Sequence, residues 1–95
     1  MEVIHKIGRR KKSVARVFMS EGKGNITVNK KSFSDFFDTA ILQYKIQQPF
    51  NLTETKDKFD LLVTVKGGGV NGQAEAIRLA ISRALVEFNN EFKPA

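Results

Sequence analysis

The chain has 95 residues, of which 41% are hydrophobic, and 16 Lys and Arg against 10 Asp and Glu give it a net charge of +6. No apolar run approaches the roughly 20 residues of a membrane span, no cysteine is present for a disulfide or a thiolate zinc site, and the N-terminus lacks the apolar stretch of a signal peptide. We therefore expect one cytoplasmic globular domain over residues 1–95, with no membrane partner, metal or cofactor.

The positive charge is concentrated at the N-terminal end of the chain. Residues 1–31 hold nine Lys or Arg against two Glu, whereas residues 32–95 hold seven against eight acids, so the net charges are +7 and −1. A basic face on a neutral body is typical of a protein that binds a polyanion, although a solvated flank or a nuclear signal has a similar composition. The basic segment over residues 6–12 is expected to form an extended arm or a strand edge.

The next two elements are predicted to be strands. Residues 13–19 are apolar and β-branched, and alternation places Arg16 on the face opposite Val17, beside the basic segment. Residues 21–24 contain two glycines and predict a turn, and residues 25–29 alternate polar and apolar side chains. The pattern therefore predicts a hairpin between the strands 13–19 and 25–29.

Two helices are expected in the middle of the chain. Ser32 can cap a short helix over residues 33–37, whose three phenylalanines fall on one stripe and are interpreted as core rather than as base-stacking residues. Residues 38–47 are a second helix candidate, which the pair Gln48–Pro49 is expected to end. A weak strand is expected to begin at Phe50.

A strand and a long helix complete the pattern. Residues 59–66 are the strongest strand candidate, with the length and β-branched content of a buried central strand. Residues 73–92 have a period of 3.6, and Arg83 and Glu87 are spaced for an exposed ion pair. The predicted apolar stripe of this helix is formed by Ile77, Ala80, Ile81, Ala84, Leu85, Phe88 and Phe92.

The turn between these two elements fits G-x-G-x-x-G over residues 67–72. A dinucleotide site would need a second parallel strand with an acid about 20 residues further on, and the sequence does not supply it after the helix. Two interpretations remain open: a steric crossing that tolerates no Cβ, or backbone N–H groups that meet a phosphate beside Lys66. Arg78 could reach the same phosphate or could pair with Glu75.

No group of residues predicts catalysis. The acids have no spacing that suggests a metal site or a carboxylate pair, no nucleophile is accompanied by a base, and His5 is expected to be a surface or strand residue. We therefore predict that the protein is not an enzyme. Two alternatives stay open: a small nucleotide-binding or phosphate-transferring enzyme built on the glycine turn, and a protein-binding module whose basic segment meets an acidic partner.

Two stretches carry a family resemblance. GRRKKSVARV at residues 8–17 and GGGVNGQAEAIR at residues 67–78, continued by SRAL at residues 82–85, resemble motifs of the ninth protein of the small ribosomal subunit, bacterial type. The resemblance covers essentially the whole sequence. It implies an α+β fold like domain 2 of the fifth small-subunit protein: a two-layer α/β sandwich with a mostly antiparallel sheet and helices on one face.

The resemblance also implies a function without catalysis. The expected role is a structural constituent of the ribosome that supports translation and binds small-subunit ribosomal RNA in the subunit head, next to neighbouring ribosomal proteins. Family members continue into a long basic tail that reaches the peptidyl-site transfer RNA, so that contact is assigned to no residue here. The expected RNA-binding residues are Arg9, Arg10, Lys11, Lys12, Arg16, Lys66, Gly67, Gly68, Gly69, Asn71, Gly72, Gln73 and Arg78.

Overall fold

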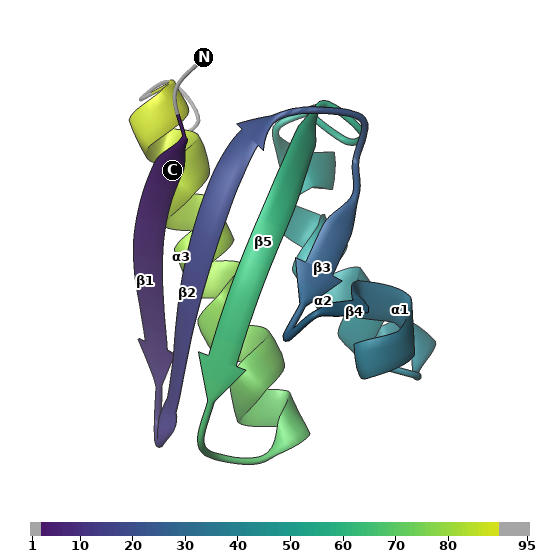
Figure 1. Ribbon diagram of the computed structural model, residues 1–95, viewed down its shortest axis with the longest axis vertical. Helices are drawn as coiled ribbons and strands as arrows, with labels where there is room; N and C mark the ends of the chain where they lie inside the picture. Colours follow the sequence, from purple (N-terminus) through teal and green to yellow (C-terminus); the bar gives the residue numbers. More distant parts are fainter. Residues whose placement is uncertain (1–2, 90–95) are drawn as a thin grey trace.

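A computed structural model describes residues 3–89 of the chain. Its five-stranded sheet has the spatial order β1-β2-β5-β3-β4 (Figure 1). All neighbouring strands are antiparallel except β3 and β5, which are parallel. In chain order the elements are β1 (Ile4–Arg10), β2 (Ser13–Glu21), β3 (Ile26–Val28), β4 (Lys31–Ser32), α1 (Phe33–Phe36), α2 (Ala40–Leu52), β5 (Phe59–Lys66) and α3 (Val70–Phe88).

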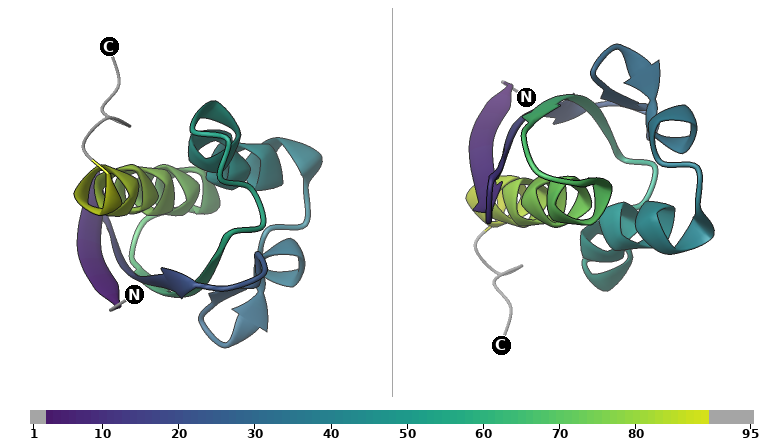
Figure 2. Two further views of the ribbon diagram at one scale, coloured as in Figure 1. Left: turned by 90° about the horizontal axis from the view of Figure 1, so that it is seen from above. Right: turned by 90° about the horizontal axis from the view of Figure 1, so that it is seen from below.

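The helices α2 and α3 lie side by side on one face of the sheet, as the two end-on views show (Figure 2). The helix α3 packs against β1 and β2, and α2 packs against α3. This arrangement confirms the predicted α+β class with a mostly antiparallel sheet and helices on one face. The opposite face, which we call the outer face, carries no helix among residues 3–89.

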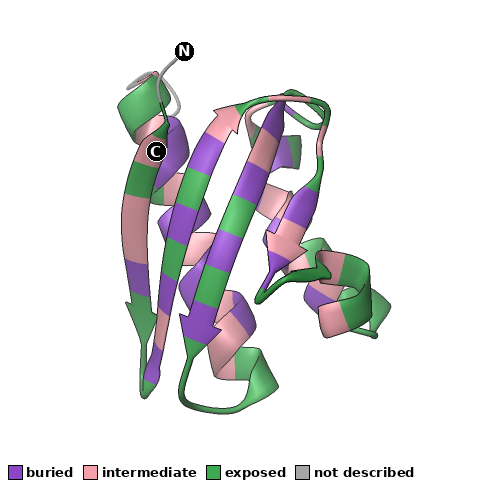
Figure 3. Cartoon of the chain, in the orientation of Figure 1, coloured by how far each residue is buried: buried purple, intermediate pink, exposed green. Residues whose placement is uncertain are grey.

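Alternation along the two long strands separates the core from the outer face (Figure 3). On β2, Ala15, Val17 and Met19 are fully buried, whereas Arg16 and Phe18 between them are exposed. The strand β5 has the same period, so it is central as predicted but is buried on only one face. Helices cover one side only, and for that reason β5 alternates instead of being apolar throughout.

The predicted hairpin between residues 13–19 and 25–29 is wrong. The strand β5 lies between β2 and β3, and the hairpin partner of β2 is β1. The glycine-containing turn after β2 crosses the end of β5 instead: Asp60 Oδ1 accepts hydrogen bonds from the backbone N–H groups of Lys23 and Asn25, both at 3.0 Å. The hydrogen bond from Asn25 lowers the pKa of the Asp60 carboxyl most, followed by that from Lys23.

The helix α2 does not end before Pro49, and the strand expected from Phe50 is wrong. Proline in a helix costs about 3 kcal/mol because it lacks an N–H and crowds the preceding turn. Ile46, Pro49 and Phe50 are buried here, and burying large apolar side chains contributes about 1.5–3 kcal/mol each, so packing outweighs the penalty. The helix ends at Leu52, and the backbone N–H of its C-terminal cap residue, Thr53, donates to Pro49 O at 3.2 Å.

The helix α3 begins at Val70, three residues earlier than predicted. Its predicted apolar stripe is buried from Ile77 to Leu85, but the prediction is wrong for Phe88, which is 43% exposed in the last turn, and Phe92 lies outside the described residues. The predicted pair of Arg83 with Glu87 is wrong, because both side chains reach β1 instead. Arg83 Nη1 donates to Ile7 O at 2.7 Å, and Glu87 forms a 2.7 Å ion pair with Lys6. The edge strand is thereby fixed to the helix behind it.

The phenylalanine stripe packs as predicted. Phe37 is fully buried, and Phe33 and Phe36 are partly buried against the core. Ser32 is the N-terminal cap residue of α1, but its hydroxyl bonds to that of Ser34 at 2.8 Å and caps no backbone group. Tertiary packing therefore holds this single-turn helix in place.

Candidate nucleic-acid interface

The register of three strands places basic side chains in neighbouring rows on the outer face. Arg9 of β1 lies opposite Val14 of β2, which lies opposite Lys66 of β5. In the next row, Arg16 of β2 lies opposite Thr64 of β5. Because side chains alternate between faces along a strand, all five point away from the helices.

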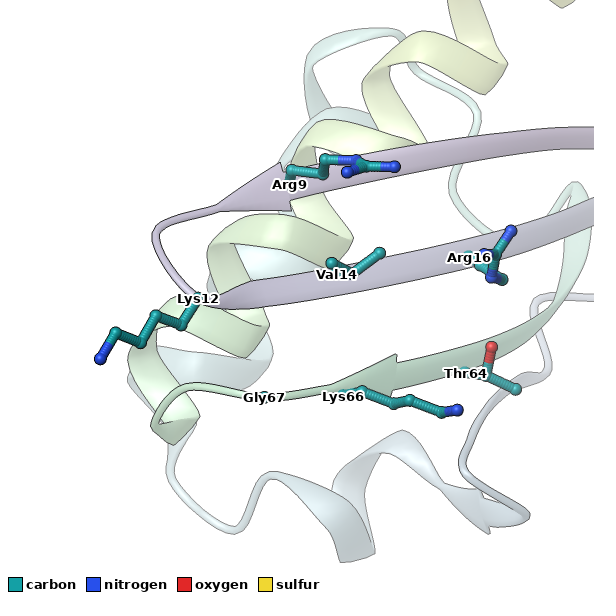
Figure 4. A pocket seen from close by; sticks show the side chains of 7 residues that line it. All are labelled: Arg9, Lys12, Val14, Arg16, Thr64, Lys66 and Gly67. Atoms are coloured by element: carbon teal, nitrogen blue, oxygen red, sulfur yellow. The ribbon is translucent and has the colours of Figure 1, made fainter.

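These side chains surround a shallow hollow of about 320 Å³ (Figure 4). Arg9, Arg16 and Lys66 lie over three neighbouring strands, whereas the Lys12 side chain extends away from the hairpin turn. We call this feature the basic hollow, and the described residues that line it, none of them acidic, are Arg9, Lys12, Val14, Arg16, Thr64, Lys66 and Gly67. A lining with four cations and, within residues 3–89, no acidic residue favours a polyanion.

The run of four bases at residues 9–12 is divided by the β1–β2 hairpin. Arg10 is the last residue of β1, and alternation places it on the opposite side of the strand from Arg9. Lys11 takes a φ of 55° in the turn and is exposed. The structure therefore brings Arg9, Arg16 and Lys66 together on the outer face, with Arg10, Lys11 and Lys12 at the hairpin tip.

The glycine loop, residues 67–72, packs directly on that hairpin. Gly67 and Gly68 have φ values of 80° and 60°, and a Cβ on them would overlap Lys12 O and Ser13 Oγ, respectively. Ser13 is fully buried, and its hydroxyl donates to Gly67 O at 3.0 Å; Gln73 Nε2 donates to the same oxygen at 3.2 Å. The steric interpretation therefore accounts for Gly67 and Gly68.

Gly69 differs from its neighbours. Of the glycines in the described part of the chain, it alone has no heavy atom within 4 Å of the position that a Cβ would take. It caps α3, and the first helical bond runs from Gln73 N to Gly69 O at 2.9 Å, so the N–H groups of Val70, Asn71 and Gly72 precede the first intrahelical bond. Such a helix start favours an anion.

Arg78 lies elsewhere. It is on α3, facing α2, where its Nη2 forms a 2.6 Å ion pair with Glu75 and its Nη1 lies 3.4 Å from Gln48 Oε1. The hydrogen bond from Arg78 lowers the pKa of the Glu75 carboxyl, and Lys45 at 3.4 Å also lowers it. Of the two roles left open for Arg78, the geometry favours pairing with Glu75 over a contact near the basic hollow.

One further row of side chains on the outer face was not predicted from the sequence. His5 lies opposite Phe18, and Phe18 lies opposite Leu62. The rings of His5 and Phe18 are stacked, with centroids 4.3 Å apart and planes 4° apart. The alternation that placed Arg16 on the outer face also places Phe18 there, but the partners of Phe18 depend on strand pairing.

Within residues 3–89, no cluster of three or more His, Cys, Asp or Glu residues could hold a metal ion. No helix in that part of the chain has the length and apolar character needed to cross a bilayer.

Known proteins resemble this chain along nearly its whole length. Residues 8–95 match the family described as ribosomal protein S9/S16. The small ribosomal subunit protein uS9 of Christiangramia forsetii is 64% identical over 91 residues, which are 96% of this chain and 71% of the relative. The proteins of the same name from Cytophaga hutchinsonii and Bacteroides fragilis are 56% and 52% identical, covering 98% and 100% of this chain and 73% and 74% of the relatives.

Proposed function

Because the chain belongs to the ribosomal protein S9/S16 family, we propose that it binds small-subunit ribosomal RNA in the subunit head through the basic hollow and the adjacent hairpin turn. The family makes it a structural, non-enzymatic component of the small subunit, at work on cytoplasmic ribosomes in translation. Its neighbours in our proposal are RNA and other ribosomal proteins of the head. Contact with the peptidyl-site transfer RNA is assigned to none of its residues.

The observation that supports the RNA contact is that Arg9, Arg16 and Lys66, from three neighbouring strands, lie on one face, with Lys12 in the adjacent hairpin turn. Arginine forks such as those of Arg9 and Arg16 match phosphate oxygens in pairs, and Lys12 and Lys66 add point charges. The sheet holds these groups at fixed positions, so they recognise the shape of a folded backbone rather than a base sequence. Arg10 and Lys11 extend the contact at the hairpin tip.

In this proposal the glycine loop has two roles. Gly67 and Gly68 let the loop that follows Lys66 lie against the hairpin, and Lys66 shares a row with Arg9 across Val14 of β2. The segment from Gly69 to Gln73, with the free N–H groups of the α3 start, lets RNA backbone approach closely. Arg78 is paired with Glu75 on the side of α3 that faces α2, so the proposal gives it no direct phosphate contact.

The test is the salt dependence of binding to small-subunit ribosomal RNA. With about five phosphates neutralised, log affinity should fall with log salt at a slope of roughly −4, and Arg16→Gln should reduce the size of this slope by about 1. Lys56→Gln, which removes an exposed lysine of the α2–β5 connection, is the matched control and should leave the slope unchanged. An affinity that is insensitive to salt would contradict the proposal.

A further inference from the structure

The row beside the basic hollow has a different chemistry. Phe18 is 38% exposed and Leu62 is 64% exposed, and His5 stacks on Phe18 at the edge of the sheet. These side chains contribute nothing to the core, which lies on the other face. Apolar side chains that stay exposed beside a basic site are available to the same ligand.

We propose that the aromatic step, formed by His5, Phe18 and Leu62, binds an unpaired nucleobase of the RNA whose phosphates the basic hollow neutralises. The proposal rests on the function proposed above and adds a base contact to it. It assigns single-stranded character to the RNA at this point, since the faces of bases inside a duplex are covered by the neighbouring bases.

The spacing of the rows supports this assignment. Arg16 and Phe18 are two residues apart on β2, so their rows are separated by about 6.8 Å along the strand. A phosphate held at Arg16 therefore leaves the base of the same or the next nucleotide close to Phe18. Aromatic rings beside a basic groove are the combination with which proteins bind single strands, because every base has a face that can stack.

Charge on the outer face favours RNA over an apolar protein surface. Moving along β5 from the basic hollow, Lys66 is followed by Thr64 and then by Leu62 of the aromatic step. Asp60 lies beyond Leu62, and its carboxylate already accepts the backbone hydrogen bonds of the turn after β2. A ligand that covers both features needs an anion next to a flat apolar group, and a nucleotide has both.

The first experiment uses Phe18→Trp as a probe, because the chain contains no tryptophan. Addition of small-subunit ribosomal RNA should quench the emission of Trp at position 18 as a base packs on the part of the indole that His5 does not cover. Inorganic polyphosphate supplies phosphates without bases and should bind without quenching. Tyr44→Trp, at a residue 61% exposed on α2, is the matched control and should remain unquenched with both ligands.

The second experiment separates base contact from charge. Phe18→Leu keeps an apolar side chain outside the core, so the fold should be retained, and affinity for the RNA should fall roughly 5- to 100-fold. Its salt slope should equal that of the wild type, because no phosphate contact is lost, whereas Arg16→Gln should change the slope.

The outcomes distinguish the two proposals. The stacked base is supported if RNA quenches the probe and polyphosphate does not, and if Phe18→Leu binds RNA more weakly than the wild type with the same salt slope. Normal salt-dependent binding with an unquenched probe overturns the stacking proposal and leaves the RNA-binding function intact. Binding without salt dependence overturns both. A photoreactive residue at position 18 that attaches to a ribosomal protein in assembled subunits, instead of to RNA, would assign the aromatic step to a protein partner and refute the proposal.

Discussion

Replacing Gly67 with alanine tests whether the glycine loop is built by close packing on the β1–β2 hairpin. Alanine at a φ of 80° is strained by about 1–2 kcal/mol. Its Cβ would also overlap Lys12 O, a backbone atom that can move only if the hairpin moves, and such overpacking costs about 1–3 kcal/mol. Alanine also lowers the conformational entropy of the unfolded chain, which offsets about 0.4–1 kcal/mol of this loss. The free energy of unfolding should therefore fall by about 1.5–4 kcal/mol.

Urea unfolding followed by circular dichroism measures this change. The midpoint should fall while the dependence on urea stays constant, since the same surface is exposed on unfolding. Gly69→Ala is the matched control: with a φ of −95° and no atom near its Cβ position, it should change stability by no more than about 0.5 kcal/mol. Equal midpoints for the two variants would refute the steric account of the loop.

Three further predictions concern single contacts. Ser13→Ala removes a buried hydroxyl that donates to the glycine loop at 3.0 Å and should lower the free energy of unfolding by about 1 kcal/mol in urea titrations; an unchanged midpoint would contradict the role of this bond. Asn29→Ala removes the side-chain amide that exchanges hydrogen bonds of 2.9 and 3.1 Å with the backbone of Val65, and should cost about 1–2 kcal/mol, as measured by thermal unfolding. The hydrogen bond from Arg78 holds the pKa of Glu75 below its ordinary value of 4.5, so the stability from this pair is complete above that pH and is lost as pH falls through the lowered pKa. Glu75→Gln should therefore unfold with a weaker dependence on acid than the wild type, and identical acid profiles would show that the pair does not contribute.

The candidate site was partly predictable from residue order. Alternation along residues 13–19 places Arg16 outward, and the clustered charge marks the N-terminal segment as its neighbour. The sequence does not predict that Lys66 lies in the same row as Arg9, because this depends on β2 pairing with β5 across a separation of about 50 residues. Phe18 was missed for the same reason: its neighbours His5 and Leu62 come from two other strands.

The fold shows a similar division. The strand over residues 59–66, the core face of α3 and the core role of the phenylalanine stripe follow from periodicities of two and 3.6, which depend only on backbone geometry. The end of α2 does not follow from such a period, because the packing of Phe50 outweighs the local cost of Pro49. The order of the strands is not given by a local period either, because the turn after β2 is held by Asp60, which is remote in sequence.

By itself the sequence therefore determined which faces of β2, β5 and α3 turn to the core, where the charge is concentrated and which family the chain resembles, since composition and local period are properties of neighbouring residues. The tertiary structure alone decided which strands pair, that the four bases of residues 9–12 are divided at a hairpin, and that three strands present cations and an aromatic pair on one face. The physical reason is that strand pairing is fixed by hydrogen bonds and packing between distant segments, and no local pattern encodes those partners.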